Sequence, residues 1–144
     1  MIFFEQYKYL IVPFTVWLGI QLYKVIFEYF KTHKFNYKRI LGAGGMPSSH
    51  SAVVACIATM TGKNCGIDSP VFAIATIYAL VVMYDAAGVR REAGKQAKVL
   101  NEIVENQEMK NNMQMQEKLV EMLGHTPIQV MVGALIGFAV GIFF

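Results

Sequence analysis

Long apolar segments with almost no charge dominate this sequence and limit what the chain can fold into. The segment from Pro70 to Ala87 has no charged residue before Asp85, and the segment from Pro127 to Phe144 has none. A third, from Tyr9 to Phe27, is almost as apolar. A helix needs about 20 apolar residues to cross a bilayer of ~30 Å hydrocarbon thickness, so these segments favour membrane-spanning helices. We predict an all-α integral membrane helical bundle.

A fourth apolar segment is shorter, and whether it crosses the bilayer stays open at this point. Ser51–Thr61 is apolar and approaches a full span only as part of 47–67. With it, residues 1–144 form one membrane domain whose spans cover about 9–27, 47–67, 70–87 and 127–144, with a cytoplasmic helical loop at 88–124. The composition agrees, since 55% hydrophobic and 16% charged residues leave too little polar surface for a soluble domain of 144 residues.

The basic residues predict the orientation. They gather in the two loops that follow the first and third apolar segments, and the loop between the second and third has only Lys63. By the positive-inside rule the two basic loops are cytoplasmic, in the plasma membrane. Gln21, Lys24 and Glu28, near the end of the first segment, are expected to reach toward water. The net charge of +3 is spread between apolar segments, which argues against nucleic-acid binding.

The second basic loop is predicted to be largely helical. Its first part, Asp85 to about Asn106, is rich in helix-forming residues, so the third helix should extend into the cytoplasm. A break is expected at Asn111-Asn112, followed by an interfacial helix at 113–123 that ends before Gly124. Cys56 and Cys65 show no metal or disulfide spacing and are expected to be inert thiols.

Three clusters of polar residues have the composition of a chemical site. Gly44–Ser51 combines glycines, hydroxyls and His50 at the start of a helix, where free N–H groups bind anions. An ordinary capped helix start is the equally weighted alternative. The second cluster holds Asp85, Arg90, Arg91 and Lys95; guanidinium groups grip phosphate oxygens, although positive-inside topology alone explains such a cluster. Asp85, close to the membrane boundary, should pair with one of these arginines.

The third cluster, Gly124-His125-Thr126-Pro127, begins the last apolar segment. Pro127 suits a first helical turn, which places His125 just outside the membrane on the cytoplasmic side. Gly133, Gly137 and Gly141 follow at four-residue spacing and predict a face for close helix packing. On the predicted topology all three clusters lie on one side of the membrane. Two histidines, cationic side chains and an anion cradle suit phosphoryl transfer through a phosphohistidine.

Two of these segments resemble motifs of a known family. Pro47-Ser48-Ser49-His50 is similar to the P-S-G-H motif of type-2 phosphatidic acid phosphatases and vanadium haloperoxidases, and the segment from His125 to Gly137 is similar to their H-x-P-x-D-V-x-x-G-x-x-x-G segment. Nearly the whole chain resembles the compact divergent branch of that superfamily. The resemblance implies that His125 attacks phosphorus, that His50 protonates the leaving oxygen and then activates water, and that Ser48 and Ser49 hold phosphate oxygens. It implies no metal and no cofactor.

The sequence departs from the family pattern at three places. No Lys followed by Arg-Pro precedes Pro47, and Leu119 stands where the family has an arginine. Arg90, Arg91 and Lys95 are the candidates for the missing charge. Gln129 replaces the carboxylate that orients the imidazole and stabilises its cation, so Asp85 or Glu121 would have to take that role.

The expected function is therefore metal-independent hydrolysis of a lipid phosphate at the cytoplasmic face. Phosphatidylglycerol phosphate and phosphatidic acid are the favoured substrates, because both are made on the inner leaflet. The alternative is a non-catalytic protein that binds phospholipid headgroups or assists assembly, which Gln129 and the missing motifs favour. The expected partners are the bilayer and its lipid phosphates, and four short helices bury little surface, which favours a homodimer.

Overall fold

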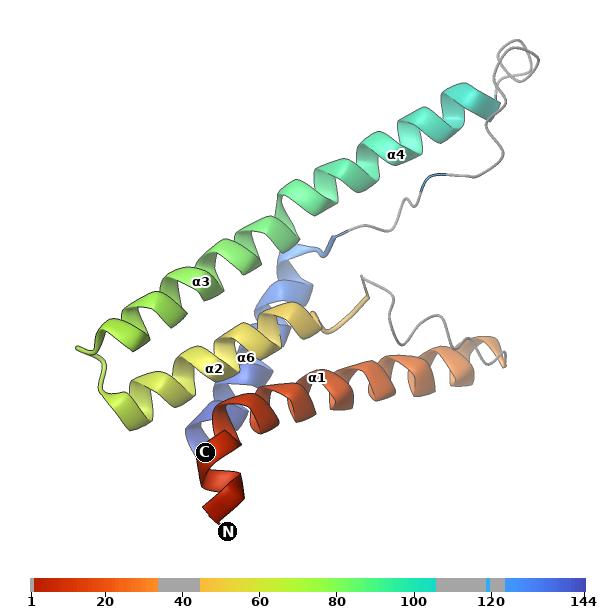
Figure 1. Ribbon diagram of the computed structural model, residues 1–144. Helices are drawn as coiled ribbons and strands as arrows, with labels where there is room; N and C mark the ends of the chain where they lie inside the picture. Colours follow the sequence, from red (N-terminus) through yellow and green to blue (C-terminus); the bar gives the residue numbers. More distant parts are fainter. Residues whose placement is uncertain (1, 34–44, 106–118, 120–123) are drawn as a thin grey trace.

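The protein is a bundle of long helices. The computed structural model describes residues 2–33, 45–105, 119 and 124–144. The helices are α1 (Ile2–Thr32), α2 (Ser49–Cys65), α3 (Pro70–Ala87), α4 (Val89–Glu105) and α6 (Pro127–Phe143) (Figure 1). No strand occurs in these described ranges. The predicted all-α fold is confirmed, and α1 extends beyond the predicted segment at both ends.

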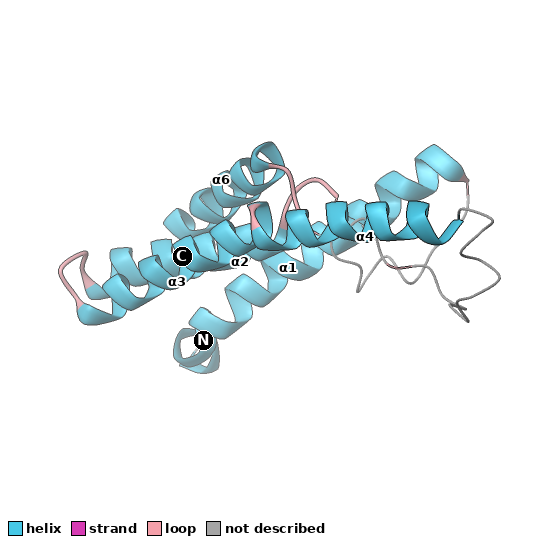
Figure 2. Ribbon diagram, turned by 90° about the horizontal axis from the view of Figure 1, so that it is seen from above, coloured by secondary structure: helices cyan, strands magenta, loops and turns pink. Residues whose placement is uncertain are grey.

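Helix α2 is the centre of the bundle. It packs against α1, α3 and α6, whereas α1 and α3 make no contact with each other within the described residues (Figures 1 and 2). Its side facing α1 forms a small core, in which Ala52, Cys56 and Met60 lie against Val12, Val16 and Ile20. These six positions repeat every four residues on each helix, so one face of α1 meets one face of α2.

Helices α2 and α6 run parallel and pack backbone against backbone. A β-carbon added to Gly133 would collide with the carbonyl oxygen of Ser48, and one added to Gly137 would collide with that of Ala52. One turn further on, Gly141 lies against Cys56 in the same way. The pairs advance by four residues on both helices, so the two helices keep one register over three turns. The predicted glycine face is confirmed, and it brings the N-terminal ends of α2 and α6 together.

The outward surface of the bundle is strongly apolar. The most apolar stretch of the α3–α4 segment, Pro70–Ile103, is only 11% buried, and that of Phe3–Thr32 is 39% buried. Both are long and apolar enough to cross a membrane, and Pro127–Phe143 is a shorter apolar helix. A soluble monomer rarely exposes so much apolar surface. The predicted membrane bundle is therefore confirmed, while the number of spans stays a prediction.

A break at Gly88 separates α3 from α4. The two helices are nearly collinear, and α4 leaves the bundle in the direction of α3 (Figure 1). The helical extension predicted from Asp85 to about Asn106 is thus confirmed, with an interruption that the sequence did not predict. Asn101 forms two hydrogen bonds with the backbone of Leu119. Apart from Leu119, the expected break and interfacial helix at 111–123 lie outside the described residues.

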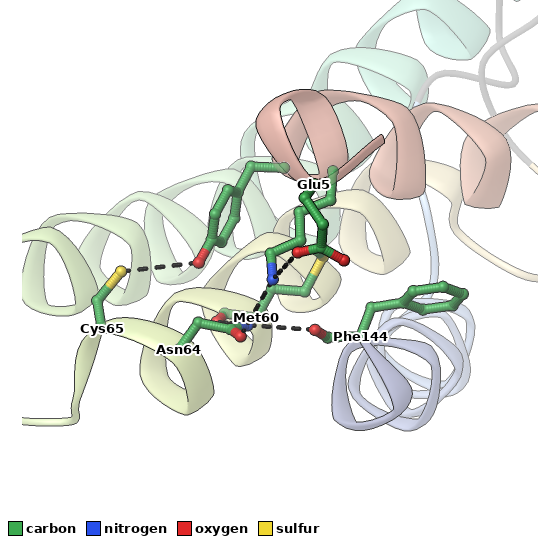
Figure 3. Close-up of polar contacts among 7 residues, drawn as sticks. Glu5, Met60, Asn64, Cys65 and Phe144 are labelled. Carbon is green, nitrogen blue, oxygen red and sulfur yellow. Dashed lines mark hydrogen bonds and ion pairs between the residues drawn. The ribbon is translucent and has the colours of Figure 1, made fainter. Parts of the chain in front are cut away.

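The opposite end of the bundle, near both termini, is closed by polar contacts. Asn64, in the last turn of α2, donates to the backbone oxygens of Met60 and Phe144 (Figure 3). Lys8 of α1 pairs with Glu5 at 3.0 Å and donates to Asn64. Cys65 lies 3.8 Å from the Tyr9 hydroxyl, and both cysteines are free thiols. These contacts fix the ends of α1, α2 and α6 relative to one another.

The polar residues of α1 do not all reach toward water. Gln21 and Lys24 are each only 4% exposed, so the expectation that they extend into solvent is wrong for these two residues. Lys24 continues the four-residue series of Val12, Val16 and Ile20. It therefore lies on the face of α1 that is turned toward the bundle, at the level where α2 begins.

The contact between α2 and α6 predicts a large difference between two glycines. Gly137→Ala would drive a methyl group into the Ala52 backbone, and we expect a loss of about 1–3 kcal/mol in unfolding free energy. Gly19→Ala is the matched control, because nothing lies within 4 Å of its added β-carbon. Thermal unfolding of both variants in one detergent measures the difference. Equal melting temperatures would contradict the close packing described here.

Candidate functional site

The N-terminus of α2 is built from buried serines. Ser48 caps the helix: its hydroxyl accepts hydrogen bonds from the Ser51 backbone N–H at 3.3 Å and from the Ser51 hydroxyl at 3.0 Å. Ser48, Ser49 and Ser51 are all buried. The Ser48 N–H donates to the Gln129 carbonyl at 3.0 Å, which ties the start of α2 to the first turn of α6. The following N–H groups, of Ser49 and His50, have no intrahelical partner, as at any helix start.

The N-terminus of α6 carries a capping box. The Thr126 hydroxyl accepts from the Gln129 N–H at 3.3 Å, and the Gln129 side-chain oxygen accepts from the Thr126 N–H at 3.0 Å. The side chain of Gln129, which stands where the family has a carboxylate, thus caps the helix. The pattern Thr-x-x-Gln before an apolar run is a known sign of this motif, and it was available in the sequence.

Main-chain contacts hold His125 in place. Its N–H donates to the Ala86 carbonyl at 2.9 Å, a carbonyl in the last turn of α3 that the helix itself does not use. Gly124 precedes it with φ of +83°, and a β-carbon there would collide with the backbone of Arg90 and Arg91. His125 itself is 3% exposed. The loop before α6 is therefore packed tightly on the junction of α3 and α4.

The two histidines of the predicted site lie together. The imidazole rings of His50 and His125 have centroids 6.0 Å apart and an interplanar angle of 73°. His50 belongs to the first turn of α2 and is half-buried, whereas His125 is fully buried. Residues 75 positions apart in the sequence thus meet because α2 and α6 are parallel and in register. The predicted convergence of the first and third clusters is observed.

The second cluster divides into residues close to the histidines and residues farther along α4. The guanidinium Nε of Arg90 pairs with Asp85 at 2.5 Å, which confirms the expected partner of that carboxylate. Arg90 and His50 line the same pocket, so Arg90 is the part of the cluster that lies at the candidate site. Arg91 is exposed, and Lys95 pairs with Glu92 at 2.6 Å on the surface of α4. The hydrogen bond from Lys95 keeps the pKa of the Glu92 carboxyl below its usual range.

Lys24 is the site residue that the sequence analysis did not identify. It is buried on the face of α1 that is turned toward the bundle, at the level of the first turn of α2, to which His50 belongs. The signal was its four-residue spacing from Ile20, which puts it on the inward face of α1. No group of three or more His, Cys, Asp or Glu side chains suited to a metal ion occurs among the described residues. The site instead combines two imidazoles, two cationic side chains and two helix N-termini, all of which favour an anion.

Comparison with known sequences agrees with this geometry. The sequence model of the divergent PAP2 family matches residues 5–140. The chain belongs to this family. It is also 40% identical over 127 residues to the uncharacterized membrane protein YuiD of Bacillus subtilis (strain 168), covering 81% of this chain and 80% of that protein. No solved structure matches the chain.

Membership of the divergent PAP2 family confirms the resemblance that the two histidine motifs suggested. In this family member, four segments bring predicted site residues to one end of the bundle. These are α2 with Ser49 and His50, α3 with Asp85, α4 with Arg90, and the residues before α6 with His125. Ser48 lies at the same end, where its N–H donates to the Gln129 carbonyl and its hydroxyl caps α2. Glu121, the second candidate for the missing carboxylate, lies outside the described residues.

The capping box predicts how position 129 responds to substitution. Gln129→Ala removes the acceptor for the Thr126 N–H, and we expect a loss of about 0.5–1.5 kcal/mol in unfolding free energy. Gln129→Glu keeps a side-chain oxygen at the same reach and should stay near the wild type. Thermal unfolding in detergent measures both variants. Equal stability of the two would mean that the capping bond contributes nothing.

Proposed function

We propose that the protein hydrolyses the phosphate or diphosphate group of a membrane lipid through a phosphohistidine on His125. The observation that carries the proposal is the His50–His125 ring pair at 6.0 Å. Membership of the divergent PAP2 family supports it, and both histidines lie in the segments that resemble the motifs of the type-2 phosphatidic acid phosphatases. A nucleophile and a general acid that lie side by side are what a two-step phosphoryl transfer requires.

In the first step a nitrogen of the neutral His125 imidazole attacks phosphorus. A nitrogen–phosphorus bond forms while the bond between phosphorus and the lipid oxygen breaks. His50 donates a proton to that leaving oxygen, so the product is a lipid alcohol, or a lipid monophosphate when the substrate is a diphosphate. The hydrogen bond from the His125 N–H to the Ala86 carbonyl, and the close packing of Gly124 on the α4 backbone, keep the nucleophile fixed during the step.

In the second step water replaces His125 on phosphorus. His50, now neutral, accepts a proton from the attacking water and returns to its starting state. The nitrogen–phosphorus bond breaks, its electron pair returns to the His125 imidazole, and inorganic phosphate leaves. Because His50 acts first as an acid and then as a base, its half-buried position at the opening of the site suits both roles.

Positive charge for the phosphate comes from several sources. The parallel starts of α2 and α6 contribute partial positive charges and the N–H groups of Ser49 and His50. Arg90 engages Asp85 through Nε, and its terminal amino groups are the donors suited to phosphate oxygens. Lys24 adds a charge from α1. Arg91 and Lys95 extend the basic surface along α4, where they would meet a lipid headgroup.

The site is proposed to face the cytoplasm in a protein that crosses the plasma membrane several times. Helix α1 ends, and α2 and α6 begin, at the site end of the bundle, while both termini lie at the other end (Figure 1). The basic residues gather in the sequence after α1 and after α3. An inward-facing site favours lipid phosphates of the inner leaflet, such as phosphatidylglycerol phosphate or phosphatidic acid.

Substitution of the histidines tests the mechanism. We expect His125→Ala to lower phosphate release from these lipids by about a thousandfold or more, because it removes the nucleophile. His50→Ala should lower it by about 10²–10⁴-fold through loss of the proton donor. The exposed His33, just beyond α1, provides the control His33→Ala, which should keep wild-type turnover. The measurement is phosphate release by detergent-purified protein, and a wild type inactive on every lipid phosphate would refute the proposal.

Arg90 allows a separate test of the charge. Arg90→Ala should lower turnover by roughly 10–100-fold, the range expected for lost hydrogen bonds to a charged group. Arg90→Lys should recover part of it, because an ammonium keeps the charge without the planar fork. Lys98→Ala is the control on α4, where Lys98 lies 3.8 Å from Glu102 and is well exposed. Turnover that is the same in Arg90→Ala and Lys98→Ala would remove Arg90 from the site.

One observation favours a second function, the binding of phospholipid headgroups without catalysis. The Gln129 side chain caps α6, so the position four residues after His125 supplies no carboxylate to the imidazole. The same cationic surface would still bind an anionic headgroup. A wild type that binds lipid phosphates in a liposome assay and releases no phosphate would establish this alternative.

A further inference from the structure

An apolar groove leads away from the paired histidines along the bundle. It lies over α2 between α1 and α3 and has a volume of about 460 Å³, within the usual range of roughly 300–1,000 Å³ for ligand pockets. Its walls are formed by Phe14 and Trp17 of α1, Val53 and Ile57 of α2, and Tyr78 and Val82 of α3. We call it the α1–α3 groove. It exists because α1 and α3 both pack on α2 without contacting each other in the described parts of the chain.

The groove changes character along its length. His50 and Arg90 line one end. The α2 residues that line the groove beyond His50 are all apolar: Val53, Val54 and Ile57. From His50 to Ile57 the helix rises by about 10 Å, at 1.5 Å per residue. A lipid phosphate has the same polarity, with an anionic head and a hydrocarbon chain that begins within a few ångströms of it. The cationic end of the groove is thus complementary to the head, and the apolar part to the chain.

The groove is open toward the surroundings of the bundle. Phe14 and Tyr78, on its two rims, are each 60% exposed, and the rings of Phe14 and Trp17 stack at a centroid distance of 5.6 Å to form the α1 wall. Along a membrane-embedded bundle this opening faces hydrocarbon. A lipid can therefore enter from the side, without its chain passing through water.

We infer that the α1–α3 groove binds the hydrocarbon chain of the substrate, and that the enzyme is selective for lipid phosphates with a long chain. This inference rests on the proposed function. The phosphate lies at His50 and Arg90, and the methylene groups that follow the first few of one chain lie between Phe14 and Tyr78. The remainder of the chain leaves the groove laterally into the bilayer. Binding of the chain then positions phosphorus next to His125 and raises kcat/KM for long-chain substrates.

Filling the groove should affect only substrates that use it. Val82→Trp and Val53→Trp place an indole in the groove from α3 and α2. With hexadecyl phosphate, we expect kcat/KM to fall by about tenfold or more, the equivalent of two methylene groups removed from apolar contact. With butyl phosphate, which is too short to occupy the groove, kcat/KM should stay within about twofold of the wild type. Val81→Trp is the matched control, since Val81 is 59% exposed on the outside of α3 and does not line the groove.

A binding measurement separates this inference from the proposed function. Hexadecyl phosphate that carries a diazirine in its chain is photolysed with the wild type and with His125→Ala, and the adducts are mapped. Adducts on residues 53–57 and 78–82 that Val82→Trp abolishes support the groove, even for a protein that releases no phosphate. If phosphate is released but the three tryptophan variants behave alike, or if diazirine-labelled hexadecanol reacts equally well, the groove does not select lipid phosphates and the inference is overturned.

Discussion

The contact between α2 and α6 is the constraint on which the rest of the structure depends. Gly133 and Gly137 remove the side chains that would separate the two backbones, and the helices settle in parallel with one register. In the membrane, where hydrophobic burial does not drive helix association, such close packing is a main source of attraction. Parallel packing also has an electrostatic cost, because it sets two helix dipoles side by side with the same sign at each end. An anion bound at the paired N-termini would offset that cost.

This arrangement explains why the chemical residues belong to helix starts. His50 lies in the first turn of α2, and His125 lies directly before the cap of α6. The hydrogen bond from Ser48 to the Gln129 carbonyl fixes one start against the other at 3.0 Å. The break at Gly88 completes the candidate site, since it leaves the Ala86 carbonyl for His125, and Arg90, two residues further on, lines the same pocket as His50. Fold and site are thus set by the same few backbone contacts.

The sequence predicted the elements and the convergence of the two histidine motifs, because both depend on local patterns: apolar length, small residues every four positions and capping residues. It did not predict the interruption at Gly88, which leaves the Ala86 carbonyl to accept a hydrogen bond from a residue 39 positions away in the sequence. Nor did it predict the burial of Lys24, which depends on which face of α1 meets α2. The capping role of Gln129 was not predicted either, although the sequence contains its pattern, Thr126-x-x-Gln129 before an apolar segment. Comparison with the family motif treated Gln129 only as a missing carboxylate.

Position 129 shows how a departure from the family pattern can be tolerated in part. A carboxylate there would both orient the imidazole and stabilise its cation. In this chain the hydrogen bond from the His125 N–H to Ala86 and the packing of Gly124 on Arg90 and Arg91 hold the backbone of the histidine, which would supply part of the first task. The second task is electrostatic and has no substitute on α6. Asp85, the acid at the end of α3, pairs with Arg90. A phosphohistidine mechanism in this protein would therefore depend on preorganised geometry more than on charge behind the nucleophile.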